Sequence, residues 1–249
     1  MTAFALYRQP TLLNYVTHRH LKLARLADAS MADGMHACFL AATEFAMAAR
    51  EYVIVFAGAE ADGISRVQPM VLLGVAEGEN LFVEGTQWSG RYVPAFIRRY
   101  PFWTVKLEGA SGPAVMYDAW WRGFSETEGD PLYEAENRPA PRLLEALQFI
   151  ESFEVEALRT QAFCARLGEL GLLREMTASV TLGDGKQLAL NGFFTVDEDK
   201  VRALPDAVVV ELHRNGMLAA IHFHLMSLGN LQALADRKAS RMPAPAAAT

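Results

Sequence analysis

The sequence contains only two cysteines in 249 residues, and it has no apolar run of about 18 residues that could cross a membrane. Its start, MTAFALYRQPTLLNYV, lacks the basic segment and long apolar run of a secretory signal peptide. Without an oxidising compartment, Cys38 and Cys164 are expected to be reduced and buried. These features predict a soluble cytoplasmic protein without a transmembrane segment, and export to the cell surface without a classical signal peptide is the alternative.

Basic charge is also scarce, since 23 Lys and Arg stand against 29 Asp and Glu, for a net charge of −6. Binding to nucleic-acid phosphates needs a basic face, so we expect no nucleic-acid partner. Hydrophobic residues make up 51% of the chain and charged residues 21%. This composition is typical of a globular protein, built as one large domain or as two closely packed halves.

The sequence contains no motif that by itself identifies a catalytic mechanism. The sequence has neither the GxSxG elbow of hydrolases nor the glycine spacing of phosphate-binding loops, and we predict no cofactor. Two His-x-His pairs occur, His18 with His20 and His222 with His224. On a strand, each pair would share a face and could offer two imidazoles to a metal. A solvated or polar strand face is the commoner reason for this pattern, so no metal is predicted, with His222 and His224 as a weak alternative.

The residue patterns predict an α+β protein. Residues 1–125 are expected to form a mainly antiparallel sheet with packed helices, including a helix over Cys38–Arg50 and a hairpin across Glu77–Glu79. The strands predicted in this half are Tyr15–Leu26, Tyr52–Phe56, Arg66–Ala76, Asn80–Glu84, Phe102–Leu107 and Ala114–Trp120.

Residues 140–238 are expected to form a second, helix-rich half packed on the first, in one continuous domain or in two. Apolar residues at spacings of three and four predict one long helix over Arg142–Leu170 that ends at Gly171. Asp184-Gly185 predicts a hairpin. Asp197 or Thr195 is expected to cap a short helix through Arg202, and Pro205 is expected to begin another through His213. A strand over Met217–His224 precedes a helix over Ser227–Lys238. Residues 239–249 are predicted to be a disordered tail.

The densest cluster of aromatic and arginine residues begins in Gly78–Phe102. Pro94 and Pro101 bound a short helix there, with Arg98 and Arg99 at its C-terminal end, where the helix dipole favours cations. Surface ion pairing and anion recognition both account for these arginines. We expect Arg98 or Arg99 to pair with an acid, and Glu44, the single acid on an apolar helix, is the first choice. Large aromatic and arginine side chains dominate binding anchors, and the candidate binding residues are Trp88, Tyr92, Arg98, Arg99, Trp103, Trp120 and Trp121.

Several blocks together resemble the SapC-like family of bacterial proteins, named for a protein associated with a surface layer. They are EFAMAAREYVIVF (Glu44–Phe56), GENLFV with YVPAFIRRYPF in Gly78–Phe102, LNGFFTVDEDKVRALPD (Leu190–Asp206) and GMLAAIHFHLMSLGNLQAL (Gly216–Leu234). The resemblance implies a non-catalytic binding or accessory protein of a bacterial surface-layer or uptake system. Its expected partner is a protein or a small ligand, and a homo-oligomer is possible. The alternative is an enzyme that binds a small molecule or a peptide through dispersed residues.

Overall fold

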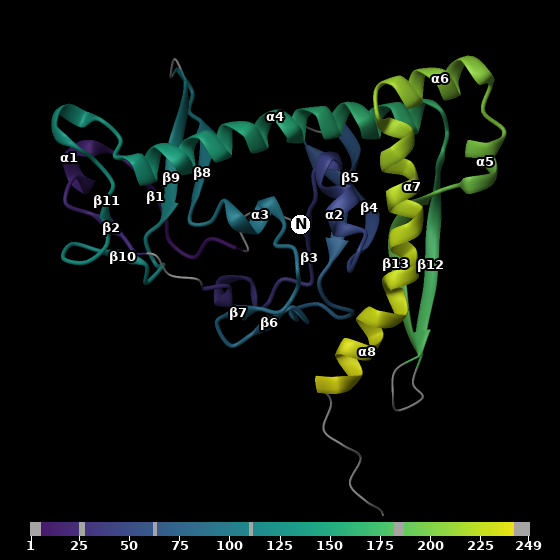
Figure 1. Ribbon diagram of the computed structural model, residues 1–249, viewed down its shortest axis with the longest axis horizontal. Coiled ribbons are helices and arrows are strands. Elements are labelled where there is room, and N and C mark those ends of the chain that lie inside the picture. Colours follow the sequence, from purple (N-terminus) through teal and green to yellow (C-terminus); the bar gives the residue numbers. More distant parts are fainter. Residues whose placement is uncertain (1–5, 25–27, 62–63, 110–111, 182–186, 242–249) are drawn as a thin grey trace, which may run out of the picture.

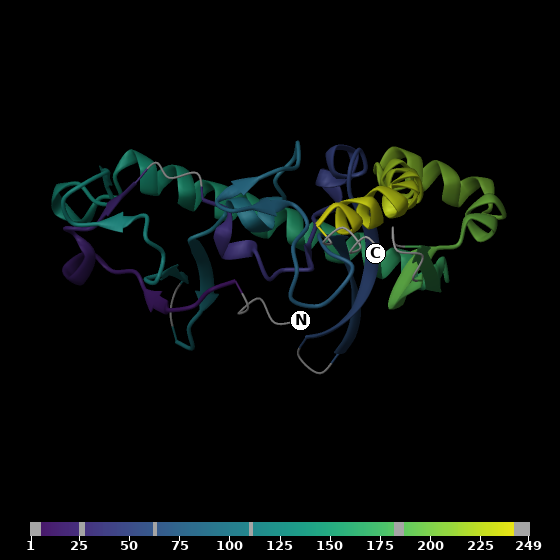
Figure 2. The same cartoon turned by 90° about the horizontal axis from the view of Figure 1, so that it is seen from below.

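The computed structural model describes residues 6–24, 28–61, 64–109, 112–181 and 187–241. Within these residues, helices and antiparallel strands are both abundant, so the α+β class predicted from the sequence is confirmed. The molecule is elongated, with α1 near one end and α5 and α6 near the other (Figures 1 and 2).

The largest sheet has five antiparallel strands in the order β12-β13-β4-β5-β3. Two long hairpins build it, and they meet where Phe193 and Phe194 of β13 pair with Ala57 and Phe56 of β4. The predicted strand Tyr52–Phe56 and the predicted hairpin strands around Asp184 are confirmed, while the turn itself lies outside the described residues. The strand bounds are β3 Ala37–Phe39, β4 Val53–Ala61, β5 Ile64–Leu72, β12 Leu173–Thr181 and β13 Gln187–Val196.

Three smaller sheets have the strand orders β1-β9-β8, β10-β2-β11 and β6-β7. The hairpin predicted across Glu77–Glu79 is wrong, because β5 pairs with β4 and β3, whereas β6 pairs with β7. The Asn80 side chain donates to the Ala32 carbonyl and accepts from the Phe82 amide, and the Leu81 amide donates to the Leu73 carbonyl just beyond β5. The strands are β1 Pro10–Leu12, β2 Lys22–Leu23, β6 Val83–Glu84, β7 Gln87–Trp88, β8 Phe102–Lys106, β9 Pro113–Asp118, β10 Phe124–Ser125 and β11 Asp130–Pro131.

Helix α4 (Pro141–Glu169) runs along most of the molecule, as Figure 1 shows. It matches the predicted long helix, with proline in its first turn and Gly171 just beyond its end at φ 63°. Leu143 and Ile150 belong to one hydrophobic cluster, and Phe163 and Leu167 belong to another. The helix therefore joins two separate cores.

The strand predicted over Met217–His224 is wrong, because these residues form helix α7 (Met217–Ser227), which packs against β4 and β13. Ala220, Ile221 and His224 are buried on one face of the helix, but the exposed residues Ala219 and Met226 are apolar as well, which obscures the 3.6-residue period in the sequence. The predicted strand Tyr15–Leu26 instead contains α1 (Tyr15–His18), which Asn14 caps. The predicted helix Cys38–Arg50 divides into β3, η3 (Ala42–Glu44) and α2 (Phe45–Ala48).

The remaining helices are short. The predicted cap is confirmed, since the Asp197 carboxylate accepts from the Asp199 and Lys200 amides at the start of α5. Residues 239–241, where the tail was predicted to begin, belong to α8, and the rest of that tail lies outside the described residues. Among the described helices, none has the length and hydropathy that a membrane span requires. Their bounds are η2 Ser30–Ala32, α3 Ala95–Arg98, η4 Ala135–Asn137, α5 Glu198–Arg202, α6 Asp206–Arg214, η5 Leu228–Asn230 and α8 Leu231–Arg241.

Candidate functional site

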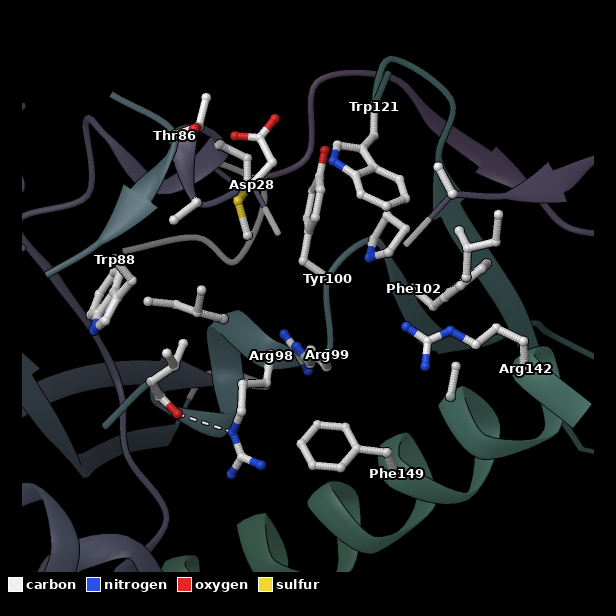
Figure 3. Close-up of a pocket in the computed structure, with 18 of the residues that line it drawn as sticks. Asp28, Thr86, Trp88, Arg98, Arg99, Tyr100, Phe102, Trp121, Arg142 and Phe149 are labelled. Carbon is white, nitrogen blue, oxygen red and sulfur yellow. Dashed lines mark hydrogen bonds between the residues drawn. The ribbon is translucent and has the colours of Figure 1, made fainter. Parts of the chain in front are cut away.

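A cavity of about 590 Å³ lies between α3, the first turns of α4 and the chain around β2 and β7. The segment 93–102 contributes one wall, and α4 contributes Arg142, Glu145, Ala146 and Phe149, which recur at helical spacing on one face. Figure 3 shows Arg98 of α3 and Arg142 and Phe149 of α4 around a common space, with Trp121 and Tyr100 across from α4. The cavity therefore joins segments that are far apart in the sequence.

The cavity gathers four of the seven predicted binding residues, namely Trp88, Arg98, Arg99 and Trp121. The other three lie elsewhere. Trp103 stacks on Tyr7 with ring centroids 3.8 Å apart, and the exposed Trp120 lies under the guanidinium of Arg8. Tyr92 is directed to Glu44, to which its hydroxyl donates at 2.6 Å.

Sequence reasoning missed Asp28, Tyr100, Arg142 and Phe149 as lining residues. The spacing of Arg142 and Phe149 on the predicted long helix was a usable signal, because residues seven apart return to the same helix face. No local pattern marks Asp28.

Trp88 has a fixed orientation. Its indole N–H lies 3.0 Å from both the Tyr52 hydroxyl and the Tyr92 carbonyl. At Gly90 a Cβ atom would lie 2.4 Å from the Tyr52 hydroxyl oxygen, so the chain can approach these groups only with glycine there. The Trp88 ring is consequently a rigid part of the cavity wall.

Arg98 is held by neutral groups. Its Nε donates to the Val93 carbonyl at 3.0 Å, and its Nη2 donates to the Tyr92 hydroxyl at 3.3 Å. Its guanidinium carbon lies 5.0 Å from the centre of the Phe149 ring, and Figure 3 shows the two side chains next to each other. Within the described residues, Arg98 has no carboxylate partner.

Arg99 is buried and lies between α3 and α4. Its guanidinium carbon lies 4.4 Å from the Phe96 ring centre and 4.6 Å from that of Phe153, and its Nη1 is 3.8 Å from the Glu154 carboxylate. The predicted pairing of Arg98 or Arg99 with Glu44 is wrong, although Arg99 does pair with an acid. The Glu44 carboxylate is instead saturated by neutral donors, among them the Ala95 amide at 2.7 Å.

Arg142 extends from α4 toward the middle of the cavity in Figure 3. Its Nη1 lies 3.4 Å from Glu145, whose side chain is exposed, so this pair is weak.

Asp28, on the opposite side of the cavity, accepts from the Ser30 amide at 2.9 Å and from Arg122 at 2.8 Å. Burial favours its neutral form, but these hydrogen bonds and the Arg122 charge outweigh burial and lower the Asp28 pKa.

Tyr100 and Trp121 form the aromatic wall facing α4. The Tyr100 hydroxyl donates to Asp118 at 2.9 Å, and burial together with this bond raises the Tyr100 pKa. The Trp121 ring is 8% exposed and meets Tyr100 edge-on. Among the described residues, the Trp121 indole N–H has no acceptor.

The geometry proposed for His222 and His224 is wrong, because two residues along a helix point about 200° apart. His224 is fully buried, and its Nε2 accepts from the Val196 amide at 3.1 Å. Burial lowers the pKa of His224 to about 4. His222 lies on the exposed side, and the described residues contain no group of three or more His, Cys, Asp or Glu side chains placed to hold a metal ion.

Both cysteines are buried and unpaired, as predicted. Cys38 lies on β3 rather than on the predicted helix, and Cys164 lies on α4. Burial raises the pKa of both thiols, that of Cys164 to about 12. Neither thiol has the low pKa that makes a cysteine nucleophilic.

Comparison with known proteins places the chain in one family. A family model described as SapC matches residues 13–234, a range that contains every residue lining the cavity and the whole five-stranded sheet. Searches of curated proteins and of solved structures gave no significant match.

Proposed function

This chain belongs to the SapC family, and we propose that it is a non-catalytic binding protein whose cavity between α3 and α4 receives a small ligand. The observation that carries the proposal is the combination of aromatic walls and guanidinium groups around about 590 Å³. Binding sites for small molecules have volumes of about 300–1,000 Å³ and combine apolar walls with a few polar groups.

The ionisable groups of the cavity support binding rather than proton transfer. A general acid or base works best with a pKa near the working pH. Asp28 has a lowered pKa and is held by Arg122, whereas Tyr100 has a raised pKa and is held by Asp118. Each group keeps one protonation state near neutral pH, which suits a fixed recognition surface.

In the cell, we propose an accessory role in a surface-layer or uptake system, with the cytoplasm as the compartment. The family resemblance supports this role. A protein that recognises or delivers a ligand for such a system also needs a protein partner. The exposed Trp120 beside Arg8, outside the cavity, is the candidate contact site for that partner.

A fluorescence titration with N-phenyl-1-naphthylamine, an uncharged probe that brightens in apolar sites, tests the cavity. We expect saturable binding of one probe per chain, lost in Ala146→Trp because the new indole fills the space beside Phe149. Ala165→Trp is the matched control, since Ala165 is exposed on the same helix. Absence of binding, or equal binding by Ala146→Trp with unchanged thermal unfolding, would contradict the proposal.

A further inference from the structure

The charges around the cavity are unequal. Three arginines line it, against Asp28 and Glu145. Asp28 pairs with Arg122, which does not line the cavity. Arg142 lies 3.4 Å from the exposed Glu145, and Arg99 lies 3.8 Å from Glu154. Among the described residues, Arg98 is left without a carboxylate partner, and its charge is available for a bound anion.

Arg98 has the geometry of a prepared anion site. The Val93 carbonyl and the Tyr92 hydroxyl occupy its Nε and one Nη2 hydrogen, and Phe149 lies against the guanidinium plane. Within the described residues, Nη1 has no hydrogen-bond partner and the charge has no counter-ion. A guanidinium fixed in this way loses little side-chain entropy when it binds a carboxylate or a phosphate.

Trp121 adds a buried aromatic side chain to the cavity wall. Its side chain is more than nine-tenths buried, it lines the same cavity, and its indole N–H finds no acceptor in the described part of the chain. The indole nitrogen itself is enclosed by protein, so a ligand in the cavity meets the face of the Trp121 ring and not this N–H.

The walls determine the rest of the ligand. Rings of Trp88, Tyr100, Phe102, Trp121 and Phe149 surround the space in Figure 3, and aromatic walls favour flat apolar groups. We propose that the cavity binds an organic acid, in which a carboxylate or phosphate group is joined to a flat apolar ring system. This inference rests on the proposed function. The anion lies beside Arg98 and Arg142, which flank Phe149, and the ring system lies against the tryptophans.

Calorimetric titration of the full chain with 2-naphthoate, 2-naphthyl phosphate and the neutral isostere 2-naphthamide tests this inference. We expect at least one acid to bind about tenfold more tightly than the amide, equivalent to about 1.4 kcal/mol. The tighter acid shows whether the natural ligand is a carboxylate or a phosphate. Arg98→Gln and Arg142→Gln should each weaken acid binding about tenfold and leave amide binding unchanged.

Arg159→Gln is the matched control, because Arg159 is exposed on α4 and its one ion-pair partner in the described part of the chain is Glu156. Equal affinity for acids and amide would overturn the inference and leave the cavity as a site for neutral ligands. A preference for acids that survives in both Arg98→Gln and Arg142→Gln would also overturn it, since the anion would then bind elsewhere. Failure of all three ligands and of N-phenyl-1-naphthylamine would overturn the proposed function itself.

Discussion

The hydroxyl of Tyr92 donates a 2.6 Å hydrogen bond to the carboxylate of Glu44, 48 residues away in the sequence. The same carboxylate accepts from the Ala95 amide at 2.7 Å and the Ala41 amide at 3.0 Å. The Tyr92 hydroxyl in turn accepts from Arg98. Glu44 therefore fixes the start of α3 and, through Tyr92, the guanidinium at the cavity.

Replacement of Glu44 by Ala should lower the free energy of unfolding by about 3 kcal/mol, because it leaves buried donors without an acceptor. Glu44→Gln should cost less, since its amide oxygen still accepts. Urea unfolding measures both, and Glu151→Ala on the exposed side of α4 is the control. A loss below about 1 kcal/mol in Glu44→Ala would show that water replaces the carboxylate.

The buried His224 should make stability depend on pH. Burial holds its pKa at about 4 in the folded state, against 6.5 as its ordinary value. Between these values the unfolded chain binds more protons, so the free energy of unfolding rises with pH and falls on acidification. This histidine should account for a loss of about 2 kcal/mol between pH 7 and pH 5.

The change is measured by urea unfolding at both pH values. His224→Gln, which cannot titrate, should show a smaller difference between pH 7 and pH 5 than the wild-type protein. His222→Gln should not differ from wild type, because that side chain is exposed. The same pH dependence in His224→Gln would mean that other groups cause it.

The neighbouring tryptophans should differ in their effect on stability. Trp121 is 8% exposed and packs on Tyr100 and Phe124, whereas Trp120 is 48% exposed and contacts Arg8. Trp121→Ala should cost about 3–5 kcal/mol through the cavity it leaves. Trp120→Ala should cost about 1 kcal/mol or less, the size of an exposed cation–π contact. Equal losses by chemical unfolding would refute this difference in packing.

The two thiols should be unreactive in the folded protein. Cys38 and Cys164 are buried and their pKa values are raised, so little thiolate forms at neutral pH. A colorimetric disulfide reagent should label both in guanidinium chloride and react far more slowly under native conditions. Ala165→Cys supplies an exposed thiol as a positive control. Fast native labelling of the wild-type chain would contradict the burial.

The cavity could be predicted from the sequence only in part. Aromatic and arginine enrichment selected Trp88, Arg98, Arg99 and Trp121, which line the cavity, but it also selected Trp103, which stacks on Tyr7 in the core. Composition shows which side chains make good anchors, whereas orientation depends on neighbours distant in the sequence. The predicted pairing with Glu44 was wrong for the same reason, because the Ala95 amide and the Tyr92 hydroxyl bond to this carboxylate in place of a guanidinium.

The sequence by itself determined the elements whose signals are local. Apolar spacing set the length of α4, Asp197 set the start of α5, and the residues flanking Asp184-Gly185 set a hairpin. The tertiary structure decided whether Met217–His224 is strand or helix, because the exposed face of this helix also carries apolar residues such as Ala219, and the sequence then lacks the periodicity that separates the two. It also decided which side chains meet at the cavity, since packing of α3 against α4 brings Arg98 to Phe149, 51 residues further along the chain.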